Sequence, residues 1–205
     1  MSFDKVKEFN TTYEVVVRDT PNARVPEARL RFRLIKEEFG ELLDAIEDCD
    51  IIELADALGD IEYVVVGASL VFGIGESVLN MFDEVNEALI NGTFDLETNP
   101  LILREGHEIM LKDVRDQILT NDIEALVESF ASILALVAHT ADHYDIDLEG
   151  VIDAVHTSNM TKLGEDGKPI FREGDRKVLK GPNYKTPTDD INRIVFGSAY
   201  APTGE

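Results

Sequence analysis

Cysteine and positive charge are both scarce in this chain of 205 residues. Cys49 is the only cysteine, which excludes an internal disulfide framework and a thiolate zinc site. Only 19 Lys and Arg accompany 41 Asp and Glu, so the formal net charge is -22. This balance argues against binding DNA, RNA or an anionic membrane through a broad basic surface. We therefore expect neither a nucleic-acid polymer nor a membrane among its partners.

Long apolar runs are missing as well. The most apolar stretch, from Ile61 to Ile74, is interrupted by Glu62 and is too short to span a bilayer. The first five residues lack the charged-then-apolar plan of a signal peptide. We expect a cytoplasmic protein whose length suffices for one domain with a sound core.

Helical periodicity dominates the first 160 residues and predicts an all-α helical bundle. The expected helices cover residues 3–17, 26–46, 51–72, 77–90, 102–119, 122–144 and 147–160, with a short one near 189–195. Asp50 suits the N-cap of the third helix, and Gly73 suits its end.

The second set of helices resembles a degenerate copy of the first. Residues 50–56 line up with 122–128, and at the same offset residues 72–74 line up with 144–146. Chance similarity between amphipathic helices is the alternative. The shared order of Asp cap, long apolar helix, turn and short helix favours duplication. We expect a single domain over 1–205, with related halves at 1–92 and 100–160 and a basic tail at 161–205.

After Met160 the composition changes, because the chain's few cations concentrate there. They are Lys162, Lys168, Arg172, Arg176, Lys177, Lys180 and Lys185. Gly174-Asp175, between two short extended segments, predicts a small C-terminal β-hairpin with a two-residue turn.

Two pairs of acids, each spaced by three residues, lie inside predicted helices. They are Glu38/Glu41 and Glu53/Asp56, extended by Glu37 and Asp60. Three residues make almost one helical turn, so each pair projects from one face. Most of the third helix is apolar and must be buried, and buried carboxylates need partners. Oxygen ligands favour Mg²⁺, Mn²⁺ or Ca²⁺. A metal site and a solvated acidic surface are the two interpretations.

These acids also resemble a known signature. Glu37-Glu38-Phe39-Gly40-Glu41, followed by Glu53-Leu54-Ala55-Asp56 and Asp60, looks like the ExxE…ExxD pattern of the all-α nucleoside triphosphate pyrophosphatases. That group contains MazG-like proteins, phosphoribosyl-ATP pyrophosphohydrolases and dimeric dUTPases. Residues 156–164, 167–170 and 180–184 are similar to the C-terminal end of MazG-like members. Together the matches cover most of residues 26–185.

The resemblance implies Mg²⁺-dependent hydrolysis of a (deoxy)nucleoside triphosphate to the monophosphate and pyrophosphate, with Mn²⁺ able to substitute. It implies that Glu38, Glu41, Glu53 and Asp56 hold the metal, with Asp60 as a further candidate. Glu37, together with Glu38, would orient or deprotonate the attacking water. Asn159 and Lys162 would bind the nucleotide, with Lys180 and Tyr184 as further candidates.

This chain departs from the simple family pattern, since each half lacks what the other keeps. The metal positions of the second half fall on Met110, Asp113, Ala125 and Glu128. In the first half, the places of Asn159 and Lys162 fall on Leu89 and Gly92. One composite site explains both losses, if the halves pack as a homodimer of the family would. Two such chains could in turn form a homodimer.

Other interpretations have weaker support. His139 and His143 stand one helical turn apart and could bind zinc, but without a third firm ligand a helix-end surface is favoured. No Glu-x-x-His pattern supports a di-iron bundle, and no GxxxxGK[ST] or GxGxxG loop is present. A non-catalytic partner-binding or regulatory protein derived from such an enzyme is the alternative function. The substrate base stays open among dUTP, dCTP, dGTP, a damaged nucleotide and phosphoribosyl-ATP.

Overall fold

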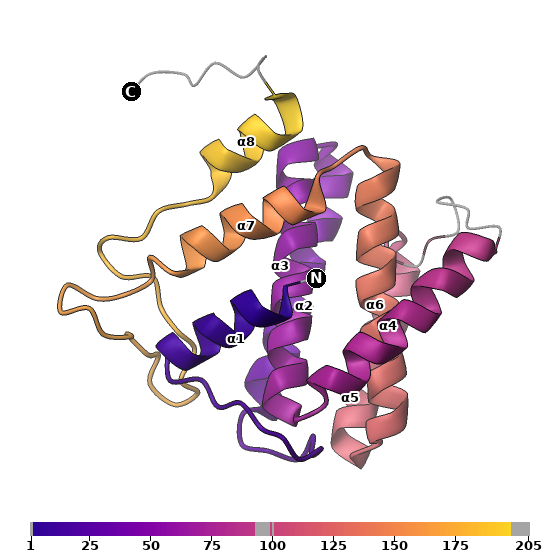
Figure 1. Cartoon of the computed structure of the whole chain (residues 1–205), viewed down its shortest axis with the longest axis horizontal. Coiled ribbons are helices and arrows are strands. Elements are labelled where there is room, and N and C mark those ends of the chain that lie inside the picture. Colours follow the sequence, from indigo (N-terminus) through magenta and orange to yellow (C-terminus); the bar gives the residue numbers. More distant parts are fainter. Residues whose placement is uncertain (1, 93–98, 100, 198–205) are drawn as a thin grey trace.

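The computed structural model describes residues 2–92, 99 and 101–197, and the regular structure of this part of the chain is helical. Its helices are α1 (Phe3–Thr12), α2 (Ala28–Asp48), α3 (Ile51–Phe72), α4 (Gly75–Asn91), α5 (Arg104–Thr120), α6 (Ile123–His143), α7 (Leu148–Asn159) and α8 (Thr188–Phe196) (Figure 1). The expectation of an all-α protein is confirmed.

Side-chain caps begin the two central helices. Asp50 accepts hydrogen bonds from the backbone N of Ile52 at 2.9 Å and of Glu53 at 3.2 Å, at the start of α3. Asp122 accepts one from the backbone N of Ala125 at 3.2 Å, at the start of α6. Both caps satisfy helix N–H groups that have no partner within the helix.

The first helix is shorter than expected and ends at Thr12 instead of Val17. Glu14 adopts a left-handed conformation with φ 52°, and the backbone N of Val15 then donates to the carbonyl of Asn10 at 2.8 Å. This turn directs the chain away from the helix axis, so residues 15–17 lie outside α1.

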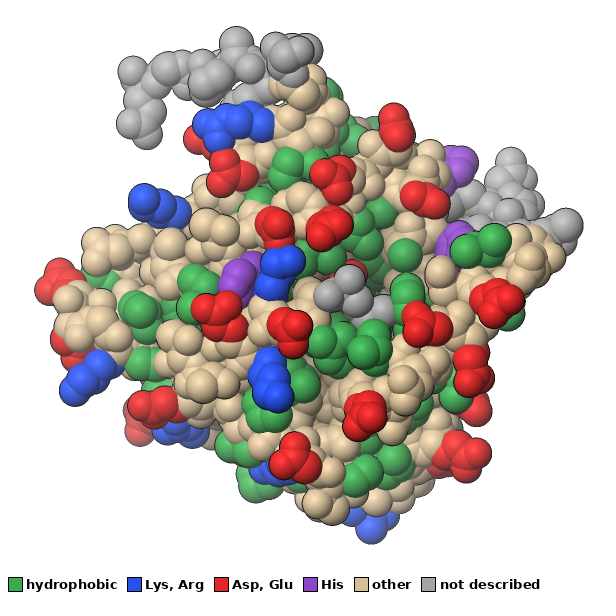
Figure 2. All heavy atoms as spheres, viewed as in Figure 1, with side chains coloured by type: hydrophobic (Ala, Val, Ile, Leu, Met, Phe, Trp, Pro, Cys, Tyr) green, Lys and Arg blue, Asp and Glu red, His purple; other side chains and the backbone are tan. Residues whose placement is uncertain are grey.

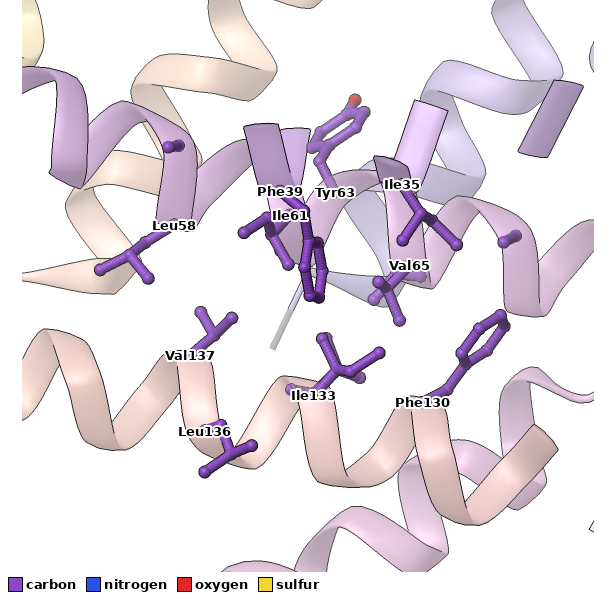
Figure 3. Close-up of a cluster of buried hydrophobic side chains, with 14 of the residues drawn as sticks. Ile35, Phe39, Leu58, Ile61, Tyr63, Val65, Phe130, Ile133, Leu136 and Val137 are labelled. Atoms are coloured by element: carbon purple, nitrogen blue, oxygen red, sulfur yellow. The ribbon is translucent and has the colours of Figure 1, made fainter. Parts of the chain in front are cut away.

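The core lies where α2 and α3 meet α6. In Figure 3, residues of α2 (Ile35, Phe39) and α3 (Leu58, Ile61, Val65) face residues of α6 (Phe130, Ile133, Val137), and all of them are buried. Tyr63 points away from this core (Figure 3). Among the described residues α6 alone has the length and composition to cross a membrane. It packs against α3, α4 and α5, which accounts for its apolar composition.

The short helices pack across the molecule, between the first part of the chain (α1 to α4) and the second part (α5 to α7). The short helix α4 packs on α6, and the short helix α7 packs on α3. The long helices also touch across the molecule, α2 with α5 and α3 with α6. Figure 1 shows α7 crossing α3 and α4 crossing α6. Each long apolar helix is therefore covered by the short helix of the other part.

The turns that bound α3 and α6 have the same backbone conformation. Cys49 and Asn121, before each helix, are left-handed with φ 56° and 60°. Gly73 and Asp145, after each helix, are left-handed with φ 72° and 55°. The members of both pairs are 72 positions apart in the sequence. Because few non-glycine residues have positive φ, this coincidence is informative.

Close packing of α7 on α3 depends on Gly59. A Cβ at this position would lie 2.8 Å from Cγ1 of Val151 and 3.2 Å from Cγ2 of Val155. A larger residue would push α7 outward. The glycine thus sets how near the end of α7, with Asn159, comes to α3.

The predicted β-hairpin is not found as a pair of strands within the described residues. The segment has two isolated antiparallel bridges, Leu163 with Pro169 and Phe171 with Val178. In place of the two-residue turn, residues 173–176 form a four-residue loop closed by a 2.8 Å bond from the backbone N of Arg172 to the carbonyl of Lys177.

Asp175 explains why the loop is wider than expected. Its carboxylate accepts hydrogen bonds from the side chains of Arg172 and of Arg33 in α2. A residue that was expected in a tight turn therefore anchors the loop to α2.

The short C-terminal helix is confirmed as α8. Acidic side chains are spread over the face in Figure 2, consistent with the net charge of -22.

Candidate active site

A cavity of about 610 Å³ lies between α1, α2, α3, α7 and the connection from α7 to α8. Acids line it from α2 (Glu37, Glu38, Glu41) and from α3 (Asp56, Asp60). Cations line it from the connection (Lys162, Arg172, Lys177, Lys180). The cavity thus has an acidic wall of helices and a basic wall of loop.

The structure brings together most of the predicted metal ligands. Glu38, Glu41, Asp56 and Asp60 all line the cavity, as expected from their spacing on α2 and α3. Glu53 does not line it and is exposed, although its charge still acts on Glu41 and Asp56. Asp60, one turn after Asp56, reaches further into the cavity than Glu53, one turn before it.

Burial and mutual repulsion raise the pKa values of these acids. Burial, and then the charges of Asp60 and Glu41, raise the pKa of Glu38 to about 9. Burial, and then the charges of Asp60 and Glu53, raise the pKa of Asp56 to about 7. Burial also raises the pKa of Asp60 to about 6, against the opposing charge of Lys162. Groups shifted in this way are typical of functional sites.

The acids suit a divalent cation. Oδ1 of Asp56 is buried without a hydrogen-bond partner among the described residues, and an ion would satisfy it. The donors are all carboxylate oxygens, the set that Mg²⁺ and Mn²⁺ prefer. No three His, Cys, Asp or Glu side chains of residues 2–92, 99 and 101–197 already form a ready-made ligand set.

We expect the metal-free protein to lose stability as pH rises. Glu38 and Asp56 have folded pKa values of about 9 and about 7, above the ordinary 4.5 and 3.8. The folded state therefore binds more protons than the unfolded state across this window, so unfolding becomes easier between pH 5 and 9. We expect Tm in EDTA to fall by roughly 2–8 °C over this range, as for about 1–2 kcal/mol in a chain of this size.

Thermal unfolding of the double variant Glu38→Gln/Asp56→Asn is the control for this prediction. Its Tm should change less over the same pH range, because Glu38 and Asp56 no longer titrate and only the contribution of the remaining acids such as Asp60 is left. An equally steep decline in the variant would assign the effect to the overall negative charge instead.

The basic wall faces the acids at short range. Nζ of Lys177 donates to both carboxylate oxygens of Glu37, at 2.9 and 2.8 Å. Nζ of Lys180 lies 4.5 Å from the centroid of the Tyr184 ring, and Nζ of Lys162 lies 5.9 Å from it. Burial lowers the pKa of Lys162, against the opposing charge of Asp60.

Asn159 and Lys162 thus share one cavity with the acids of the first part of the chain, as the composite arrangement requires. Ala125 and Glu128, at the metal positions of the second part, do not line this cavity, and Glu128 is exposed. Asn159 is buried, and its backbone carbonyl accepts a 2.9 Å hydrogen bond from Oη of Tyr13 in α1.

The connection after α7 is tied back to the end of that helix. Oγ of Ser158 donates to the carbonyl of Lys185 at 2.7 Å, and the backbone N of Lys185 donates to Oγ1 of Thr161 at 2.9 Å. A Cβ at position 181 would lie only 2.0 Å from the carbonyl O of Leu163, so only Gly181 permits this crossing. These contacts hold Lys180 and Tyr184 beside the cavity.

The sequence patterns missed several cavity residues, among them Asn10, Arg31 and Lys177. Arg31 lies seven residues before Glu38, on the same face of α2, so its position on a buried stripe was a usable signal. Asn10 is similarly a polar residue on the buried face of α1. The position of Lys177 depends on the path of the loop, which no local pattern specifies. His139 and His143 do not line the cavity.

Comparison with known proteins is consistent with this geometry. Residues 6–89 match the family model described as phosphoribosyl-ATP pyrophosphohydrolase. Uncharacterized protein L479 of Acanthamoeba polyphaga mimivirus is 29% identical over 180 residues, covering 79% of this chain and 71% of that protein. No solved structure matches the chain. The matched residues include the acids of α2 and α3, so this part of the chain is similar to the phosphoribosyl-ATP pyrophosphohydrolases.

Proposed function

We propose that this protein is a Mg²⁺-dependent pyrophosphohydrolase that converts a (deoxy)nucleoside triphosphate to its monophosphate and pyrophosphate, in cytoplasmic nucleotide-pool sanitation or control. The observation that carries the proposal is the cavity in which Glu38, Glu41, Asp56 and Asp60 face Lys162. Its acids can hold a cation and its lysines can hold phosphate oxygens, which is the arrangement that phosphoryl transfer requires. The similarity of residues 6–89 to phosphoribosyl-ATP pyrophosphohydrolases supports this type of reaction.

The carboxylates of Glu38, Glu41, Asp56 and Asp60 would hold the metal, whereas Glu53 is exposed and does not line the cavity. When bound, Mg²⁺ would neutralise phosphate charge and lower the pKa of a coordinated water. The lysines would complete the neutralisation of a triphosphate, which has about four negative charges at neutral pH. Mn²⁺ has the same oxygen preference and should substitute.

Glu37 is the group we propose to orient and deprotonate the attacking water, with Glu38 beside it. Its ion pair with Lys177 places both of its oxygens at the edge of the cavity. In the proposed step, water adds to the α-phosphorus, its proton passes to a carboxylate, and the bond to the β-phosphate bridging oxygen breaks. Pyrophosphate leaves with that electron pair, which the cationic loop stabilises.

We also propose that the chain arose by tandem duplication and that its two halves share this one site. The left-handed pairs Cys49/Asn121 and Gly73/Asp145, with the caps Asp50 and Asp122, support an offset of 72. The exchange of α4 and α7 between the long helices supports packing like that of two subunits. The mimivirus relative covers 79% of the chain, so its similarity necessarily extends past residue 89.

Hydrolysis in ¹⁸O-labelled water tests the reaction type. Attack at the α-phosphorus should place the label in the nucleoside monophosphate and leave the pyrophosphate unlabelled, as mass spectrometry can show. Asp56→Asn, prepared in parallel, should be inactive and so excludes a contaminating phosphatase. Nucleoside diphosphate and orthophosphate as main products would refute the proposal. No turnover on any nucleotide, with Mg²⁺ or Mn²⁺, would favour a non-catalytic binding protein.

A further inference from the structure

The cavity continues past the acids toward Arg31 of α2, Gly67 of α3 and Asn10 of α1. Arg31 lies seven residues before Glu38, roughly 10 Å along the helix at 1.5 Å per residue. A Cβ at Gly67 would lie 3.7 Å from Nη1 of Arg31, so the two helices meet here, well beyond Asp56 and Asp60. We call this inner end, formed by Asn10, Arg31, Gly67 and the apolar residues around them, the inner subsite.

The inner subsite contains two buried polar groups without partners. Nε of Arg31 and Nδ2 of Asn10 have no hydrogen-bond partner among the described residues. Arg31 is 9% exposed and Asn10 is 1% exposed, so bulk water does not satisfy them. Burial lowers the pKa of Arg31 to about 10, against the charge of Glu27. Because an unpartnered buried donor costs free energy, both groups point to a bound ligand.

The walls of the inner subsite are apolar and partly flat. Val6, Phe9, Val15, Leu34 and Val64 are apolar residues that line the same cavity. The ring of Phe9 stacks on Tyr13, with centroids 4.3 Å apart, and meets the edge of Tyr63 at 5.7 Å. Tyr63 also lines the cavity and points away from the α6 core (Figure 3). A planar, polar-edged group suits such walls, as aromatic rings do generally.

We propose that the inner subsite binds the nucleobase and selects bases that carry a ring carbonyl (guanine, cytosine, uracil or thymine) over adenine. The inference rests on the proposed function, because it takes the phosphates to lie between the acids and Lys162. The span of roughly 10 Å between Glu38 and Arg31 along α2 leaves room for a sugar and a base. Arg31 and Asn10 then find the partners they lack.

The preference follows from what each side chain can donate. A guanidinium only donates, whereas a carboxamide both donates and accepts. Guanine presents O6 beside N7, and the pyrimidines present carbonyl oxygens, so each offers Arg31 a strong acceptor. On adenine, N1 and N7 each lie beside the amino group at N6, which would point a donor toward Arg31. Phosphoribosyl-ATP, the substrate in the name of the matched family, carries adenine and should therefore be a poor ligand.

Calorimetric titration of the intact protein with nucleoside monophosphates and Mg²⁺ tests the inner subsite without requiring hydrolysis. We expect the best of GMP, CMP, UMP and TMP to bind at least ~10-fold more tightly than AMP, the discrimination expected when a polar site is left unpaired. Arg31→Met keeps the length of the side chain and should abolish that difference. Because it removes an unpartnered buried charge, its Tm should stay the same or rise. If Arg31 had only a structural role, the replacement would lower the Tm.

Two further variants complete the test. Arg29→Met removes an exposed arginine from the same helix, outside this cavity, and should leave selectivity unchanged. Gly67→Val should weaken the binding of every monophosphate, because the larger side chain fills the inner subsite. The fold should tolerate the change, since a Cβ at this position makes only ordinary contacts, 3.6 Å from Cγ1 of Val6. If Arg31→Met does not fold, Gly67→Val still tests the location.

Equal affinity for AMP and the others, or discrimination that survives Arg31→Met, would overturn the inner subsite, as would the absence of binding by every monophosphate. Selective binding without release of pyrophosphate from any triphosphate would instead refute the proposed function and leave the subsite standing. Equal turnover of ATP and all other triphosphates would refute the inner subsite and leave the proposed function standing.

Discussion

Replacing Asp56 by asparagine should reduce pyrophosphate release by at least ~1,000-fold while leaving the helical fold intact, because a carboxylate at the reaction centre is lost. Oδ1 of Asp56 is the buried oxygen without a partner, and burial raises the pKa of this acid to about 7. A neutral amide removes the repulsion from Asp60 and Glu53, so the Tm of the metal-free variant should equal or exceed that of the wild type. Added Mg²⁺ should raise the Tm of the wild type only.

Glu128→Gln is the matched control for Asp56→Asn. Residue 128 occupies the corresponding place in α6, is exposed, and does not line the cavity. Its replacement should change turnover by less than about two-fold, as for most surface substitutions. Full activity of Asp56→Asn in metal-replete buffer would remove this residue, and the proposed metal site, from the mechanism.

Replacing Lys162 by alanine should lower kcat/KM for the best triphosphate by about ten- to a hundred-fold, the loss expected for one charge-assisted hydrogen bond to phosphate. Lys162 lies in the basic wall, and the charges of Asp60 and Glu38 act on it. It comes from the second part of the chain and the acids come from the first. The rise in Tm that Mg²⁺ produces should persist, since the variant keeps every carboxylate.

Lys168→Ala removes an exposed lysine from the same connection, outside the cavity, and should retain full activity. The comparison separates a local role from the general effect of losing one positive charge in a chain of net charge -22. Wild-type kinetics in Lys162→Ala would refute the shared site. The duplication would stand, because it rests on the backbone correspondence and the packing of α4 and α7.

Local signals predicted the helices well because their ends are encoded by single residues. Asp50 and Asp122 cap α3 and α6 through their own side chains, and Gly73 ends α3 in the left-handed conformation that glycine tolerates. The acids were predictable for a related reason. Helical spacing fixes which carboxylates share a face, and Glu38, Glu41, Asp56 and Asp60 do line one cavity.

Features set by distant contacts could not be predicted in the same way. Asp175 was expected in a tight turn, but Arg33, 142 residues earlier in the chain, binds its carboxylate. Glu53 was expected among the ligands, but at the first turn of α3 it lies in the exposed part of the helix. The pairing of Lys177 with Glu37 spans 140 residues and depends on the path of the loop. The reaction type came from family resemblance, since spacing alone fits any oxygen-ligand metal site.

The exchange of short helices between the two long ones changes what a single substitution can do. In a homodimer with two identical sites, one mutation changes both subunits. An altered wall in one site is therefore always accompanied by the same alteration in the other site. Here α3 and α6 are separate stretches of one chain, as are α4 and α7. The acids can therefore vary without altering the basic wall, and the surfaces left without acids are free to acquire other contacts. Under the duplication we propose, separate stretches of one gene encode the two walls, and the symmetry of a homodimer is no longer required.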